Sequence, residues 1–233
     1  MQHTPTHTLA GQEWTDGNGF RLDLRNRVHR GGNTNVSYIE TIHHGNVTDN
    51  ACEAYPGQTS VQVKRLALQP GAYIFASKFI LVHLGTNDRR VSSHETSSTA
   101  LSHFASLPAS LKQDAGDSLV IVSNLVEHRK TAVDQCITQP KAGLLGAVQQ
   151  AREDDQKGVL VDMHGEVLIY DLNATDSTHP SDVGYAVMAR KWHQDLKDDS
   201  TDMSRPNGSG SATSEGSAAE RTRAGPSNVW LLR

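Results

Sequence analysis

The chain has 233 residues, a formal net charge of -4 and 36% hydrophobic residues. This length suits one medium α/β domain with a tail better than two domains. The weak negative charge excludes the basic footprint of a nucleic-acid-binding protein and a basic membrane-binding face, and no apolar run approaches membrane-spanning length.

Helices and strands are predicted to alternate along the chain. Phe20, Leu24 and Val28 recur at helical spacing, and the continuous apolar run at 79–84 is typical of a strand that is covered on both faces. The predicted elements are a helix over 19–29, a strand over 36–39, a helix ending before residue 70, strands over 79–84, 119–122 and 159–161, and helices over 97–107, 144–151 and 185–196. This alternation predicts an α/β protein with a mainly parallel sheet between two helical layers.

Composition divides the chain into three parts. Residues 1–15 are polar and irregular, and residues 16–197 carry the alternating elements. From residue 198 the sequence is rich in Ser, Gly, Thr, Pro and charge. Such a segment buries too little apolar surface to offset its ordering entropy, so residues 198–233 are predicted to form a disordered tail.

The cellular compartment stays open. Cys52 and Cys136 are too few for a disulfide scaffold, and the sequence does not say whether they pair. The N-terminus has no apolar core of the kind that a secretory signal needs. Four N-glycosylation sequons weakly favour the secretory pathway, at Asn35, Asn46, Asn173 and Asn207.

Polar residues follow the most apolar strand directly, as Gly85-Thr86-Asn87-Asp88. Ligand sites collect outside the carboxyl ends of parallel strands, so this loop is well placed. The Asn87 amide could donate a hydrogen bond to the oxyanion of an ester under attack. Taken alone, the same tetrapeptide is explained as well by a turn after a strand.

A second candidate lies just before the final helix, where Asp176 precedes His179 by three residues. A carboxylate at this spacing can hold an imidazole ring and stabilise its charged form during proton transfer. Pro180 suits the first turn of a helix. The chain has 12 histidines, however, and most are expected to be surface residues.

Gly57 is the third candidate, because a glycine lets its backbone N–H approach a ligand closely. A plain Pro-Gly turn explains the same residues. The histidines show no zinc-site spacing, and no phosphate-binding glycine loop follows a strand. We therefore expect neither a metal nor another cofactor.

Taken in order, four segments resemble the SGNH hydrolase (GDSL-like) esterases across residues 16–197. The segments are Asp16-Gly-Asn-Gly-Phe-Arg-Leu22, His44-Gly-Asn-Val-Thr-Asp-Asn50 with Glu53-Ala-Tyr-Pro-Gly57, Leu84-Gly-Thr-Asn-Asp88, and Val161-Asp-Met163 with Asp176-Ser-Thr-His-Pro180. The nearest subgroup is that of carbohydrate acetyl esterases such as the acetyl xylan esterases of carbohydrate esterase family 3. Its members are often secreted.

The resemblance implies a flavodoxin-like fold and an acyl-transfer site. Asp176 would orient His179, His179 would act as the base, and Gly57 with Asn87 would hold the oxyanion. The expected ligand is a small-molecule or carbohydrate ester, with no nucleic acid or membrane partner. One motif departs from the family, because Cys52-Glu53-Ala54 stands where members often have His-Glu-Gly.

A larger departure concerns the nucleophile. The family opens with an apolar strand that runs into Gly-Asp-Ser, and its serine attacks the ester. No Gly-Asp-Ser occurs in this chain, and the expected place reads Pro5-Thr6-His7-Thr8-Leu9. We therefore expect hydrolysis to be absent or impaired.

The same segment predicts a structural gap. In the strand order 2-1-3-4-5 the first strand lies inside the sheet, and residues 1–15 contain few residues suited to that position. We therefore expect this inner strand to be missing. Three interpretations stay open: an impaired ester hydrolase, a non-catalytic carbohydrate-binding relative, and a truncated gene product that does not fold stably.

Overall fold

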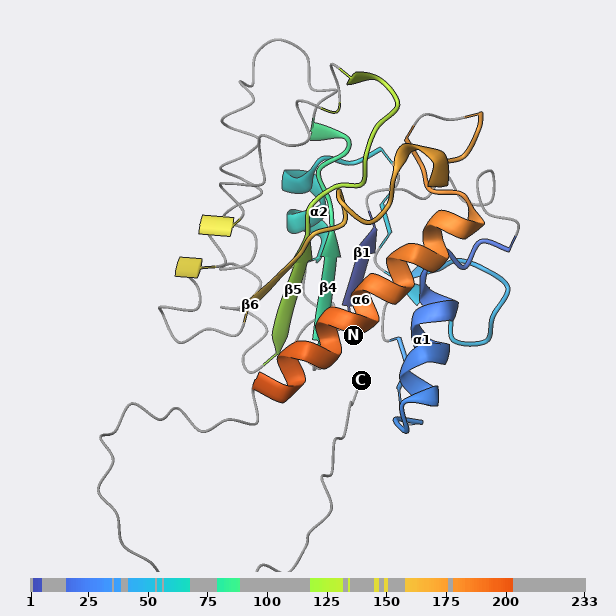
Figure 1. The fold of residues 1–233 in the computed structure, drawn as a ribbon, viewed down its shortest axis with the longest axis vertical. Helices are drawn as coiled ribbons and strands as arrows, with labels where there is room; N and C mark the ends of the chain where they lie inside the picture. Colours follow the sequence, from blue (N-terminus) through green and yellow to red (C-terminus); the bar gives the residue numbers. More distant parts are fainter. Residues whose placement is uncertain are drawn as a thin grey trace, which may run out of the picture.

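A computed structural model gives the architecture of the chain (Figure 1). It describes residues 2–5, 16–34, 36–38, 42–52, 54–55, 57–67, 79–88, 118–131, 134, 145–146, 149–150, 158–175 and 178–202. A parallel sheet lies between helices on its two faces, which confirms the predicted flavodoxin-like α/β class.

The main sheet has four strands in the order β1-β4-β5-β6, and every neighbouring pair is parallel. The strands are β1 (Gln2–Pro5), β4 (Phe79–His83), β5 (Leu119–Ser123) and β6 (Gly158–Val161). The last three match the predicted strands to within one residue at each end. All residues of β4 and β5 are buried, as expected for strands that are covered on both faces.

The expectation that the first strand is missing is wrong. Strand β1 pairs with β4 from Gln2↔Ile80 to Pro5↔His83, in the position that the order 2-1-3-4-5 gives to strand 1. The sequence Gln2-His3-Thr4-Pro5 has little β-propensity. Ladder hydrogen bonds come from the backbone, however, so a buried neighbour such as β4 can pair with an unpatterned segment.

The predicted strand over 36–39 is reduced in the described residues to a one-residue bridge at Val36. Val36 and Tyr38 nevertheless lie in the core. A small antiparallel pair follows, β2 (Ile42–His43) with β3 (Ala51–Cys52), which is absent from the predicted elements. Two residues per strand carry too little alternation to be recognised in the sequence.

Alternate residues along the strands pack into two apolar cores, one on each face of the sheet. Phe79 and Leu81 pack on the side of α1 (Arg21–Arg30) and α6 (Asp182–Asp202), where the Phe20 and Trp192 rings lie 5.9 Å apart between centroids. Ile80 and Val82 pack on the opposite side against Val63 of α2 (Ser60–Ala67). This two-sided burial follows from the period of two along each strand.

The predicted first and last helices are confirmed as α1 and α6, but the predicted tail boundary is wrong by five residues. Helix α6 continues through 198–202, because a polar, charged stretch can extend a helix whose earlier turns are already packed. Residues 203–233 and the predicted helix over 97–107 lie outside the described residues. Among the described helices, none combines the length and apolar character needed to cross a membrane.

A buried arginine ties α1 to the loop that precedes β3. Arg21 is 2% exposed, and Tyr38 Oη donates a 2.8 Å hydrogen bond to its carbonyl oxygen. Its guanidinium donates to five backbone carbonyls, those of Gly17 at 3.1 Å, Asn18 at 3.2 Å, His44 at 2.6 Å, Asn50 at 2.7 Å and Ala51 at 3.2 Å. The side chain thus satisfies carbonyls from two segments that have no common helix or strand.

Replacing Arg21 by lysine should lower the free energy of unfolding by about 3 kcal/mol, because an ammonium group has three donors and no planar fork. Urea unfolding measures the change. Arg27→Lys is the matched control, since Arg27 makes a surface ion pair with Asp23 at 2.9 Å, and it should change stability by less than about 0.5 kcal/mol. Equal losses in the two variants would contradict this role for Arg21.

A buried polar pair joins two neighbouring strands near the carboxyl edge of the sheet. His83 Nδ1 lies 2.7 Å from Ser123 Oγ, and the two residues are direct neighbours in the β4–β5 register. Burial lowers the pKa of His83 to about 4, although a backbone hydrogen bond at Asn124 offsets part of the effect. The ring is therefore neutral in the folded protein at neutral pH.

Stability should fall as the pH drops from about 6.5 to 4, because in this window the His83 ring binds a proton in the unfolded chain but not in the folded one. The loss attributable to this ring is about 3 kcal/mol at most. Urea unfolding across this range should show a smaller slope for His83→Gln than for the parent chain. His43→Gln, at an exposed position, serves as the matched control. An unchanged slope in His83→Gln would refute the assignment.

Candidate functional site

Asn87 lies in the turn that directly follows β4. The turn is closed by a 3.1 Å hydrogen bond from the Asp88 N–H to the Gly85 carbonyl, and Gly85 takes the left-handed backbone that favours glycine, with φ of 114°. The Asn87 side chain is buried, and its Nδ2 donates to the carbonyl of Gln58 at 3.1 Å.

Gly57 directly precedes Gln58, whose carbonyl accepts the hydrogen bond from Asn87. It is exposed, its φ is 76°, and a Cβ added there would meet open space. The hydrogen bond from Asn87 to Gln58 therefore brings two of the predicted oxyanion elements together, although they are 30 positions apart in the sequence.

Asp88 fastens the same two loops, a role that we did not predict. Its carboxylate accepts hydrogen bonds from both the N–H and the hydroxyl of Ser60, the first residue of α2, with a distance of 3.0 Å for the N–H. Thr59 and Gln62 add a reciprocal cap, in which Gln62 Oε1 accepts from the Thr59 N–H at 2.8 Å. This Thr-x-x-Gln spacing is a known helix-start signal, so the cap was recognisable in the sequence.

His179 lies in the segment that leads into α6. It is 6% exposed, and its carbonyl accepts from the Asn173 N–H at 2.8 Å. The preceding residue, Thr178, has its Oγ1 3.3 Å from Nε2 of His128, which lies in the loop after β5. The Lys130 N–H donates to His128 Nδ1 at 3.0 Å, so the neutral His128 ring donates from Nε2 to Thr178.

Gly57 and Asn87 are thus brought together beyond the end of β4, and His179 lies in a segment that is tied to the loop after β5. Asn87 follows β4, and His179 is tied through Thr178 to the loop after β5; the parallel strands end at the same edge. Asp176 lies outside the described residues, so its pairing with His179 stays a prediction. Among the described residues, no group of three or more His, Cys, Asp or Glu side chains is arranged to hold a metal ion.

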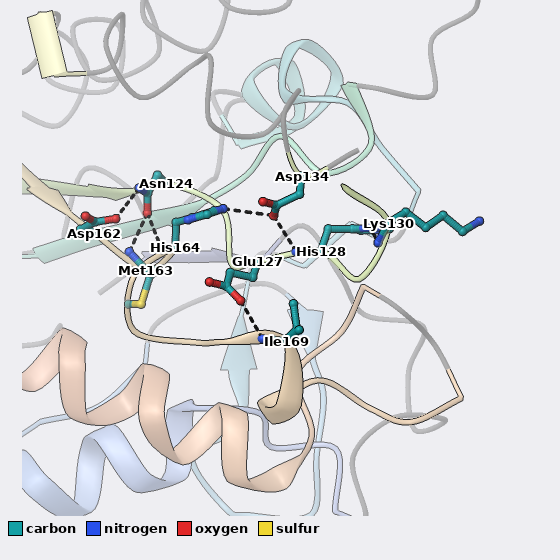
Figure 2. Close-up of polar contacts among 9 residues, drawn as sticks. All are labelled: Asn124, Glu127, His128, Lys130, Asp134, Asp162, Met163, His164 and Ile169. Carbon is teal, nitrogen blue, oxygen red and sulfur yellow. Dashed lines mark hydrogen bonds and ion pairs between the residues drawn. The ribbon is translucent and has the colours of Figure 1, made fainter. Parts of the chain in front are cut away.

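Sequence reasoning missed a polar network on the next two loops of this edge, which Figure 2 shows. Asn124 follows β5, and its Nδ2 donates to Asp162 at 2.6 Å, while its Oδ1 accepts from the backbone N–H groups of Met163 at 2.6 Å and His164 at 3.1 Å. Asp134 joins the network by accepting from His164 Nε2 at 3.1 Å. The signal was available, because Asn124 and Asp162 each follow a buried strand as Asn87 does.

A short antiparallel contact holds the turn before His179 against the start of α6. Leu172 bridges Pro180, and the Asp171 carbonyl accepts from the Ser181 N–H at 2.8 Å and from its hydroxyl at 2.7 Å. Gly184 packs so closely here that an added Cβ would clash with the Asp171 carbonyl and with Pro180. The segment that carries His179 is therefore fixed on both sides.

Replacing Gly184 by alanine should destabilise the protein by about 1–3 kcal/mol, because the added methyl group overpacks this contact. Helix propensity alone would give the opposite sign, a gain of about 1 kcal/mol. Thermal unfolding decides between the two signs. Ala186→Gly, at an exposed position of the same helix, is the control and should lose only the propensity difference. A gain in stability for Gly184→Ala would show that the contact is loose.

A separate pocket of about 330 Å³ lies between the first turns of α1 and α6. Its lining includes Asp16, Asp23 and Asp182. Gly57, Asn87 and His179 do not line it, so it is distinct from the carboxyl-edge site.

Comparison with solved structures identifies the fold. A family 3 carbohydrate esterase from Clostridium thermocellum superposes with a TM-score of 0.70 at 17% identity, covering 88% of this chain and 98% of that one. A carbohydrate esterase family 3 protein from Talaromyces cellulolyticus gives a TM-score of 0.69 at 17% identity, with 87% and 97% covered. A catalytic mutant of an acetylxylan esterase from Geobacillus stearothermophilus gives 0.56 at 15% identity, with 83% and 91% covered.

The predicted resemblance to SGNH-type esterases is thus confirmed at the level of the fold. No protein-family model and no curated protein sequence matches the chain. The TM-scores establish a shared backbone arrangement, whereas identities of this size leave the chemistry to the residues of the site.

Proposed function

We propose that this chain is a carbohydrate-ester hydrolase by descent that retains the acyl-oxygen site but is inactive or impaired because the nucleophilic serine is absent. The main support is the hydrogen bond from Asn87 Nδ2 to the Gln58 carbonyl at 3.1 Å, which joins two predicted oxyanion elements. The family 3 carbohydrate esterases and the acetylxylan esterase among the structural neighbours suggest the ligand class.

Each retained residue has a defined role in this proposal. The side-chain amide of Asn87 and the backbone N–H of Gly57 would donate to the acyl oxygen, and one such donor is worth about 3–4 kcal/mol in a transition state. His179 would remove a proton from the attacking group, and Asp176 would hold its ring. Without a nucleophile these groups bind and polarise an ester but form no acyl-enzyme.

The register of β1 supports the place of the missing serine. Pro5 pairs with His83, and Asn87 follows His83 by four residues at the same edge. Residues 6–8 follow Pro5 directly in the sequence, and they read Thr-His-Thr where the resemblance implies Asp-Ser after a glycine.

The parent chain should show no phosphonate-sensitive hydrolysis of p-nitrophenyl acetate above the rate in buffer. Restoring Pro5→Gly, Thr6→Asp and His7→Ser together should produce turnover at least about tenfold above the parent, since the remaining acid-base and oxyanion groups need a nucleophile to act. The release of p-nitrophenol with and without a serine-directed phosphonate measures both.

The matched control carries Pro5→Gly and Thr6→Asp with His7→Ala, and it should remain inactive. Adding Asn87→Ala to the restored chain should return turnover to about the parent level, because a working oxyanion donor contributes about 100-fold or more to the rate. Circular dichroism melts establish that each variant folds. A folded, restored chain without turnover would refute the retained ester site, and phosphonate-sensitive turnover in the parent would refute the missing nucleophile.

A second candidate is a carbohydrate-binding relative without turnover. The exposure of Tyr170, at 73%, favours it, because an aromatic ring in solvent beside the site suits a sugar. Binding of a sugar ester by the parent chain, with no turnover after the serine is restored, would select this second function.

A further inference from the structure

Exposed apolar side chains gather in two adjoining turns next to the His179 segment. Ile169 and Tyr170 belong to the short helical turn η3 (Ile169–Asp171), and Val183 belongs to the first turn of α6. Their exposed fractions are 48%, 73% and 65%, and among the large apolar residues that the structure describes only Val61 and Leu145 are otherwise exposed. The most exposed of all is Tyr170.

The turn that carries Tyr170 is held rigidly. Asp171 Oδ2 accepts from the Leu168 N–H at 3.1 Å, and Glu127 Oε2 accepts from the Ile169 N–H at 2.8 Å, as Figure 2 shows for Glu127. The Asp171 carbonyl accepts two hydrogen bonds from Ser181. A ring displayed from a fixed turn loses little backbone entropy when a ligand covers it.

The antiparallel contact places this turn beside the proposed acid-base residue. Asn173 bonds to His179, Leu172 bridges Pro180, and Asp171 bonds to Ser181. In this register Tyr170 lies opposite the start of α6, directly after the segment that contains His179. A ligand with its ester at His179 and a long axis along this contact would extend over the Tyr170 turn.

We propose that Tyr170 forms a sugar subsite, on which a pyranose ring of the carbohydrate ester stacks; this inference rests on the proposed function of the carboxyl-edge site. A pyranose presents an apolar face of C–H groups that suits an aromatic ring, and its hydroxyls need acceptors at the ring edge. Glu127 supplies a carboxylate next to the turn. Three side chains form too small a patch for a second protein, because a stable dimer buries about 800 Å² on each partner.

Equilibrium binding of an acetylated xylo-oligosaccharide to the full parent chain tests the subsite, because no turnover is expected to consume the probe. Isothermal titration should show that Tyr170→Ala weakens binding about tenfold, whereas Tyr170→Trp retains it. Val61→Ala removes an exposed apolar side chain on α2 and serves as the matched control with unchanged affinity. Equal affinity of the parent and Tyr170→Ala would overturn the proposal.

The serine-restored chain separates this inference from the proposed function. Tyr170→Ala in that background should leave the turnover of p-nitrophenyl acetate unchanged and raise the KM for the acetylated oligosaccharide. Restored turnover of p-nitrophenyl acetate without any Tyr170-dependent effect on the oligosaccharide would overturn the subsite alone. Tyr170-dependent binding without restored turnover would overturn the ester site and keep the subsite. A concentration-dependent dimer that Tyr170→Ala dissociates would instead show that a second copy covers the ring.

Discussion

The whole arrangement depends on one constraint, the parallel pairing of β1, β4, β5 and β6. The carboxyl ends of parallel strands lie at one edge of the sheet, and the loops that follow them begin there. Residues distant in the sequence therefore come together at this edge without any direct attraction between them. Asn87, Asn124 and Asp162 each follow a buried strand, and each uses its polar side chain to fix a neighbouring loop. The edge is thus a polar layer above two apolar cores, and a ligand at this edge would meet hydrogen-bonding groups that are already oriented.

The buried Arg21 stabilises the loop that precedes β3. Its guanidinium is compensated by backbone carbonyls alone in the hydrogen bonds that the structure describes, with no carboxylate among them. Carbonyl dipoles stabilise a buried cation only while they converge, so the loop over 44–51 keeps its shape as long as the arginine stays in place. That loop leads through β3 toward Gly57.

Local pattern was sufficient for β4, β5, β6 and α1, because apolar runs and helical spacing reflect burial directly. It also placed Asn87 at the correct edge, since that inference needs only the end of a strand. It failed for β1, because the polar residues of this strand pair with β4, which is distant in the sequence. It gave no sign of the Asp171 contact with Ser181 or of Tyr170 beside it, because a packed turn has no period. Asp176 falls outside the described residues, so its predicted role stays a prediction.

Asn87 has a structural role whether or not any ester is hydrolysed. Its bond to Gln58 closes two loops, and Asp88 beside it caps α2. Removing either residue would leave buried polar groups without partners, which costs about 1–3 kcal/mol for each group. The proposed absence of the nucleophile leaves both of these contacts in place. Asn87 would therefore be retained for stability even in a chain without turnover, as we propose for this one.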